Sequence, residues 1–116
     1  MSNKIEVLEP SGILDSVTGN KVRNDVADLI LAGVDIVLID FKNITFMDSS
    51  GLGAMVATLQ KVRTAGCKLY LCSLNDQLTM LLDLTKMLQV FEIFEIVRHL
   101  MQRSLPILNL KLLYGV

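Results

Sequence analysis

The sequence DSSGLG at residues 48–53 separates a stretch typical of a β-strand from a stretch typical of a helix. Residues 34–39 before it are β-branched and almost continuously apolar, which favours a central strand covered on both faces, with an exit over residues 43–47. After it, apolar side chains recur at helical spacing to residue 65, and Gly66 ends the pattern. Amide groups at the start of a helix have no partner within it, so a serine hydroxyl there is well situated to carry a phosphate.

Strand-like and helix-like segments alternate along the rest of the chain. The pattern predicts strands over residues 4–8, 68–72 and 89–94, and a turn at residues 10–12. It also predicts three further helices. The first covers residues 17–31, the second begins at a cap, Ser73 or Asn75, and ends near residue 86, and the third covers residues 95–104 before Pro106. Short connections between such elements predict an α/β layered domain, with helices on one or both faces of a mixed sheet.

Composition excludes several classes of function. A chain of 116 residues is about one domain, and its apolar runs are far shorter than the roughly 20 residues that span a bilayer. The N-terminus lacks the apolar core of a signal peptide, so we expect a cytoplasmic protein without a membrane segment. The 11 basic and 12 acidic residues are spread evenly and form no basic stripe, so no nucleic-acid partner is expected.

The cysteines and the histidine predict neither a metal site nor a cofactor. Cys67 and Cys72 are five positions apart on a predicted strand, so they point to opposite faces and are expected to be unpaired packing residues. His99 is alone, with no second histidine or cysteine at ligand spacing.

The C-terminal residues form a separate segment. Residues 105–116 are too apolar to extend freely into water and too short to cross a membrane. We therefore expect this tail to dock on the domain formed by residues 1–104, or on a second copy of the chain in a homodimer.

Three stretches together resemble the STAS domain family, specifically the bacterial anti-sigma factor antagonists, over about residues 4–103. The most specific is FMDSSGLG at residues 46–53, between an apolar strand and an amphipathic helix. SGILD at residues 11–15 resembles the family's Gly-x-apolar-Asp loop after an early strand, and LDLT at residues 82–85 resembles its Leu-Phe-Asp-apolar-Ser/Thr segment. The resemblance implies a STAS-like mixed β-sheet of about four to five strands with four to five packed helices.

The resemblance also implies a function and a site. The serine after the aspartate, here Ser49, would accept phosphate from a partner that is both a serine-protein kinase and an anti-sigma factor. The unmodified form would bind this partner and release a sigma factor, and a metal-dependent serine phosphatase would reverse the modification. The chain itself would catalyse nothing. The residues expected to flank the phosphate or contact the partner are Asp15, Asp48, Ser50, Gly51, Leu52 and Gly53.

Simple electrostatics is consistent with such a switch. Phosphate adds nearly two negative charges, which the first turn of a helix accommodates at about 0.3 to 1 kcal/mol per favourable contact. Beside Asp48, with Asp15 expected nearby from the family arrangement, the same charge would have to be desolvated by any partner surface. A loss of about 3 kcal/mol would weaken binding on the order of a hundredfold.

Other interpretations of the same residues remain open. Asp48 or Ser49 can simply cap the helix, which gives a STAS scaffold or regulatory module without phosphate. A hydrolase with Ser49 or Ser50 as nucleophile requires a base, but the single histidine lies far along the chain and no Gly-x-Ser-x-Gly is present. Neither a Gly-x-Gly-x-x-Gly motif nor the lysine of a phosphate-binding loop follows a strand, so the sequence does not indicate a nucleotide-binding site.

The chain departs from the family pattern at three places. Ile13 stands where the family often has Glu, and Lys86 where a Gly commonly follows the third helix. Residues 4–8 align with what is usually the second strand, so the usual first strand is missing. We expect residues 107–114 to cover the vacant edge, in the same chain or in a neighbour, because an open edge invites aggregation.

Overall fold

The computed structural model describes residues 4–94, and alternating strands and helices make up this part of the chain. The α/β class predicted from the sequence is confirmed. The elements are β1 (Ile5–Leu8), β2 (Ser11–Leu14), α1 (Ser16–Leu31), β3 (Ile36–Asp40), β4 (Asn43–Met47), α2 (Ser49–Thr64), β5 (Lys68–Cys72), α3 (Asp76–Leu84) and β6 (Glu92–Phe94).

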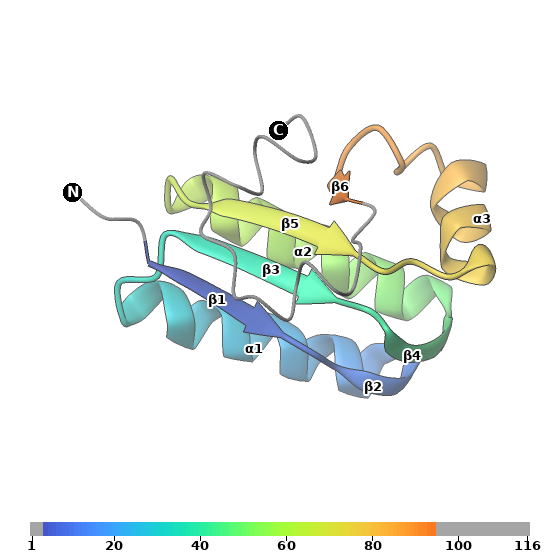
Figure 1. Cartoon of the computed structure of the whole chain (residues 1–116), viewed down its shortest axis with the longest axis horizontal. Coiled ribbons are helices and arrows are strands. Elements are labelled where there is room, and N and C mark those ends of the chain that lie inside the picture. The colour runs from blue at the N-terminus through green and yellow to red at the C-terminus, as the bar shows by residue number, and fades with distance from the viewer. Residues whose placement is uncertain (1–3, 95–116) are drawn as a thin grey trace.

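Four strands form the main sheet in the order β1-β3-β5-β6, and every pairing between them is parallel (Figure 1). All five residues of β3 are buried, as expected for a strand in mid-sheet. The strand β1 lies at one edge, where no other described strand pairs with its outer side.

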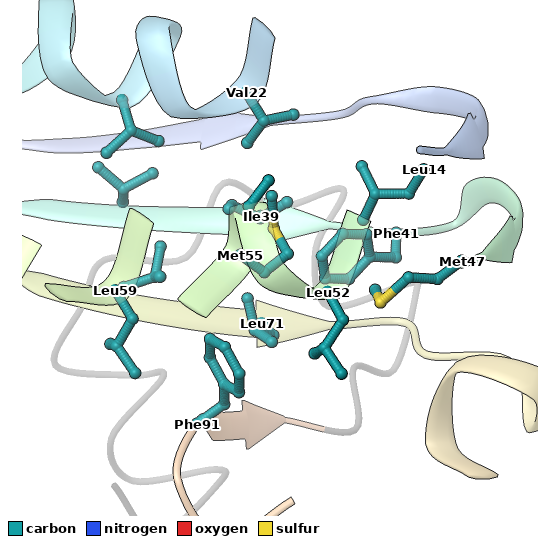
Figure 2. Packing of buried hydrophobic residues seen from close by; sticks show 14 of the residues in the cluster. Leu14, Val22, Ile39, Phe41, Met47, Leu52, Met55, Leu59, Leu71 and Phe91 are labelled. Atoms are coloured by element: carbon teal, nitrogen blue, oxygen red, sulfur yellow. The ribbon is translucent and has the colours of Figure 1, made fainter. Parts of the chain in front are cut away.

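The three helices contribute to one hydrophobic core with one face of this sheet. Val37 and Ile39 of β3 and Leu71 of β5 point into this core from the sheet. Helix α1 adds Val22 and Val26, and α2 buries a longer apolar stripe against the same face (Figure 2). The residues that α2 buries are Gly51, Leu52, Ala54, Met55, Thr58, Leu59 and Val62.

A second, two-stranded sheet was not predicted. Strands β2 and β4 pair in parallel beyond the main sheet, with Leu14 opposite Met47. The sequence pattern suggested a turn at residues 10–12 and a continuous exit from β3. Instead, β3 ends at Asp40, whose carboxylate accepts a hydrogen bond from the Lys42 amide at 2.9 Å and closes a turn before β4. Gly12 takes a left-handed conformation, with φ of 85°, where the β2 register shifts.

Other predictions need correction. Residues 4–94 contain six strands in two sheets and three helices, so the expected four to five helices are not matched, and all pairings between described strands are parallel rather than mixed. Helix α3 ends at Leu84 because Lys86 has a positive φ of 64°, the conformation that glycine usually supplies after a helix. The helix expected over residues 95–104 and the tail over residues 105–116 lie outside the described residues.

Two further observations concern the helices and the cysteines. None of the helices in residues 4–94 combines the length and apolarity needed to cross a bilayer. Cys67 is half-buried and Cys72 is buried, and both are free thiols, as the sequence predicted.

Candidate functional site

Two helices begin side by side at the carboxyl ends of β2 and β4. Because Leu14 and Met47 are partners in this parallel pair, the next residues, Asp15 and Asp48, occupy neighbouring positions. Each is the N-cap of the helix that follows, with Asp15 at the start of α1 and Asp48 at the start of α2. The structure therefore brings together the two loops that the sequence singled out 33 positions apart.

Asp48 holds the first turn of α2. One carboxylate oxygen, Oδ1, accepts the Gly51 amide at 2.8 Å and the Ser50 hydroxyl at 2.7 Å. Both hydrogen bonds lower the pKa of Asp48 below its ordinary value of 3.8. The bond from the Ser50 hydroxyl has the larger effect, and the bond from the Gly51 amide has the next largest. The backbone carbonyl of Asp48 accepts the Leu52 amide at 3.0 Å. Asp48 alone therefore caps the helix, and neither serine is needed for that purpose.

Ser49 is the first residue of α2, and its side chain is exposed. Among the described residues its hydroxyl has no hydrogen-bond partner, whereas the hydroxyl of Ser50 is donated to Asp48. The two adjacent serines thus differ: one is bound to the cap and the other faces solvent beside the free amide groups of the first turn. The sequence could not separate them, since either can cap a helix.

Gly51 and Gly53 have different surroundings. A Cβ built on Gly51 would lie 1.9 Å from the carbonyl oxygen of Leu14, so only glycine lets α2 approach the end of β2. A Cβ on Gly53 would meet nothing within 4 Å, and this residue is exposed. Leu52, between them, is 7 % exposed and points into the core (Figure 2). Gly51 and Leu52 therefore hold the start of α2 against β2 and the core, whereas Gly53 lies on the surface, where a partner could contact it.

Asp15 forms the matching cap on α1. Its carboxylate accepts the Thr18 amide at 3.0 Å, and its carbonyl accepts the Gly19 amide at 2.8 Å. Gly19 is buried where α1 meets α2, and a Cβ there would lie 2.6 Å from the Ala54 Cβ. The two helices thus pack closely near their starts, so the positive ends of two helix dipoles lie in one region.

Two amide side chains of the α3 region, Asn75 and Gln77, bind the edge of β4. Asn75 was predicted as a possible cap of this helix, but the contacts of both side chains with β4 were not predicted. Gln77 accepts the Met47 amide through Oε1 at 2.8 Å and donates Nε2 to the Met47 carbonyl at 2.9 Å. Asn75, the N-cap of α3, donates Nδ2 to the carbonyls of Ile44 and Thr45 at 3.2 and 3.3 Å. Together they satisfy backbone groups that a third strand would otherwise pair.

An exposed apolar pair lies on the same two strands. Ile13 of β2 and Phe46 of β4 are register partners, and they are 52 % and 46 % exposed. Cross-strand partners lie close enough to form one continuous apolar contact surface. Each residue of this pair lies two positions before a cap, Asp15 or Asp48, so the pair lies at the same end of the two strands as Ser49. Among the residues that the structure describes, no three potential ligands cluster as a metal site would require.

Comparison with known proteins places this geometry in context. The family model for the STAS domain matches residues 2–100. An anti-sigma F factor antagonist of Paenibacillus polymyxa is 28% identical over 90 residues, which is 77% of each chain. An anti-sigma-B factor antagonist of Bacillus subtilis is 31% identical over 83 residues, 72% of this chain and 75% of that one.

Solved structures share the fold. The anti-sigma factor antagonist SpoIIAA in its unphosphorylated form matches with a TM-score of 0.64 and 17% identity, covering 90% of this chain and 91% of its own. Bacillus SpoIIAA in the phosphorylated form matches with a TM-score of 0.66 and 16% identity, and the match covers 90% of this chain and 95% of that one. The STAS domain of a SulP transporter from Vibrio cholerae matches with a TM-score of 0.67 and 15% identity, and the match covers 84% of this chain and 77% of that one.

Proposed function

Since the chain belongs to the STAS domain family, we propose that it is an anti-sigma factor antagonist, an interaction module switched by phosphate on Ser49. In its unmodified form it binds a serine kinase that is also an anti-sigma factor, and a sigma factor is released. Phosphate on Ser49 ends this binding, and a metal-dependent serine phosphatase restores it. The chain acts in the cytoplasm and has no catalytic role of its own.

The observation that carries the proposal is the contrast between Ser49 and its neighbours. Asp48 satisfies the cap, Ser50 is bound to Asp48, and only the Ser49 hydroxyl is exposed without a described partner. A kinase can therefore reach this oxygen without opening the helix. The absence of a side chain at exposed Gly53 leaves room for the approach.

The domain is suited to keep its fold when phosphate is added. At the first residue of α2 the new oxygens face free amide groups and the positive end of the helix dipole, which favours the dianion. The similarity to SpoIIAA in both its unphosphorylated and its phosphorylated form supports a modification that leaves this architecture intact.

A docked partner, in contrast, would be strongly affected. The surface beside Ser49 combines the apolar pair Ile13 and Phe46 with the carboxylates of Asp15 and Asp48. A partner that covers the apolar pair must also remove water from the phosphate, which lies close to two existing negative charges. A penalty of about 3 kcal/mol would reduce affinity roughly a hundredfold.

One observation favours a second candidate, a STAS scaffold that is never phosphorylated. Asp48 already completes the helix start, so the site is stable without modification, and the fold is shared with a domain of a SulP transporter. In this alternative Ser49 is only an exposed helix residue.

Binding measurements test the proposal. Switch-type kinase anti-sigma factors of the same organism are titrated by calorimetry with the wild type, with Ser49→Asp and with the control Asn24→Asp, which adds the same charge on an exposed position of α1. We expect Ser49→Asp to bind at least tenfold more weakly and the control to bind like the wild type. Equal affinities for all three proteins would favour the scaffold.

A further inference from the structure

The main sheet has a second face, opposite to the helices, and this face is apolar and buried. Residues of β3, β5 and β6 that alternate with those of the helical core form a separate cluster there. The cluster consists of Ile36, Leu38, Tyr70, Cys72 and Phe94, which are 0 to 5% exposed, with Ile5 of β1 packed against it. Tyr70 and Phe94 stack with ring centroids 5.0 Å apart. We call these six residues the second face.

No described helix covers the second face. The core residues that the three helices contribute all belong to the cluster on the opposite face, and the second face contains strand residues alone. Parallel sheets are stable when both faces are covered. The cover must therefore come from outside residues 4–94.

We propose that the apolar tail, residues 105–116 of the same chain, lies across the second face. The chain leaves the described region at Phe94, which is itself part of this face. Four strands span about 14 Å, at about 4.8 Å between neighbours. Residues 95–104 alone reach about 15 Å even when fully helical, so the tail begins within reach of every strand of the sheet.

The chemistry of the tail fits this position. Its apolar residues are Leu105, Ile107, Leu108, Leu110, Leu112, Leu113, Tyr114 and Val116. In its middle, Leu108, Leu110 and Leu112 alternate with Asn109 and Lys111, so an extended tail presents leucines to one side and polar groups to the other. The sequence alone suggested the vacant edge beside β1, whereas the structure shows that the second face is an apolar surface that requires a cover.

Cys72 provides a direct probe. It lies on the second face with no exposed surface, and burial, followed by the charge of nearby Asp40, raises the pKa of its thiol to about 12. A thiol of this kind reacts slowly with maleimides, because the thiolate is the reactive form. The chain contains one other cysteine, Cys67, which is half-buried and serves as an internal reference.

The test compares the labelling rates of both thiols by mass spectrometry in the full chain and in three variants. One variant ends at Ser104, one is Leu110→Glu with Leu112→Glu, and the control is Asn109→Glu with Lys111→Glu, which places the same new side chains on the polar side. We expect Cys72 to react at least tenfold faster in the first two variants, with Cys67 unchanged, and to stay protected in the control. Far-UV circular dichroism confirms that each variant is folded.

Two outcomes would overturn the proposal. Continued protection of Cys72 in a folded chain that ends at Ser104 would show that another segment covers the second face. A dimer by light scattering that dissociates when residues 105–116 are removed would show that the tail covers a second copy. Neither result depends on phosphorylation of Ser49, so the proposed function stands or falls separately.

Discussion

Gly51 in the first turn of α2 lies directly against the carbonyl group of Leu14 at the end of β2. A Cβ at residue 51 would come within 1.9 Å of that oxygen. The contact joins the two loops of the candidate site, because Asp15 follows Leu14 and Ser49 precedes Gly51 by two positions. Their relative placement is thus fixed by backbone packing.

Replacing Gly51 with alanine should separate these loops. Since the obstacle is a backbone carbonyl that cannot rotate away, we expect Gly51→Ala to destabilise the domain by about 3 kcal/mol. Gly53→Ala is the matched control on the same helix, where the new Cβ meets open space, and should stabilise by about 0.5 to 1 kcal/mol. Urea unfolding measures both. Equal effects of the two substitutions would contradict the packing described here.

Gln77 should position the strand that leads to Ser49. Gln77→Ala leaves both backbone groups of buried Met47 without their partner, and we expect a loss of about 1 to 3 kcal/mol. Hydrogen exchange of the Met47 amide should accelerate in this variant. Gln60→Ala, an exposed glutamine on α2, should change stability by less than about 0.5 kcal/mol. Unchanged protection of Met47 would show that Gln77 does not hold β4.

Asp48 should make stability depend on pH in the acid range. Its folded pKa lies below 3.8, so the charged carboxylate stabilises the folded state above that value, and the contribution disappears as pH falls through the folded pKa. Asp48→Asn retains an acceptor for the cap but has no charge to lose. We therefore expect the wild type to be more stable than Asp48→Asn at neutral pH, and the difference to shrink in acid. A difference that is constant with pH would contradict this assignment.

Phe46 should contribute to partner binding and little to folding. It is 46 % exposed, and removing an aromatic anchor from an interface commonly costs about 1 to 2 kcal/mol, or roughly tenfold in affinity. Leu84→Ala removes an equally apolar side chain, 73 % exposed at the end of α3, and should leave affinity unchanged. Calorimetry with the kinase partner compares them. If Leu84→Ala weakens binding and Phe46→Ala does not, the docking surface lies elsewhere.

The parts of the fold set by local patterns could be predicted from the sequence. The apolar run of β3 and the helical period of α2 identify a buried strand and the helix behind it without tertiary information. Strand β2 could not be predicted, since Ser11 and Gly12 favour a turn and become a strand only by pairing with β4, about 30 residues later. Strand β6 was predicted, but over residues 89–94, whereas the structure limits it to Glu92–Phe94.

The sequence indicated the residues of the candidate site, but it did not indicate which of them caps the helix and which hydroxyl remains exposed. Asp48, Ser49 and Ser50 are all suitable capping residues, and only the geometry shows which oxygen accepts the amide and which hydroxyl is left exposed. The roles of Gly51 and Gln77 depend on contacts with Leu14 and Met47, residues distant in sequence that no local pattern can reveal.

Site-resolved mapping of phosphate tests the central claim most directly. The wild type, Ser49→Ala and Ser50→Ala are incubated with the kinase partner and Mg-ATP, and modified peptides are identified by mass spectrometry. We predict phosphate on Ser49 in the wild type, none in Ser49→Ala, and modification of Ser49 in Ser50→Ala at a comparable extent. Phosphate that persists unchanged in Ser49→Ala, or a wild type that a binding-competent kinase leaves unmodified, would contradict the account.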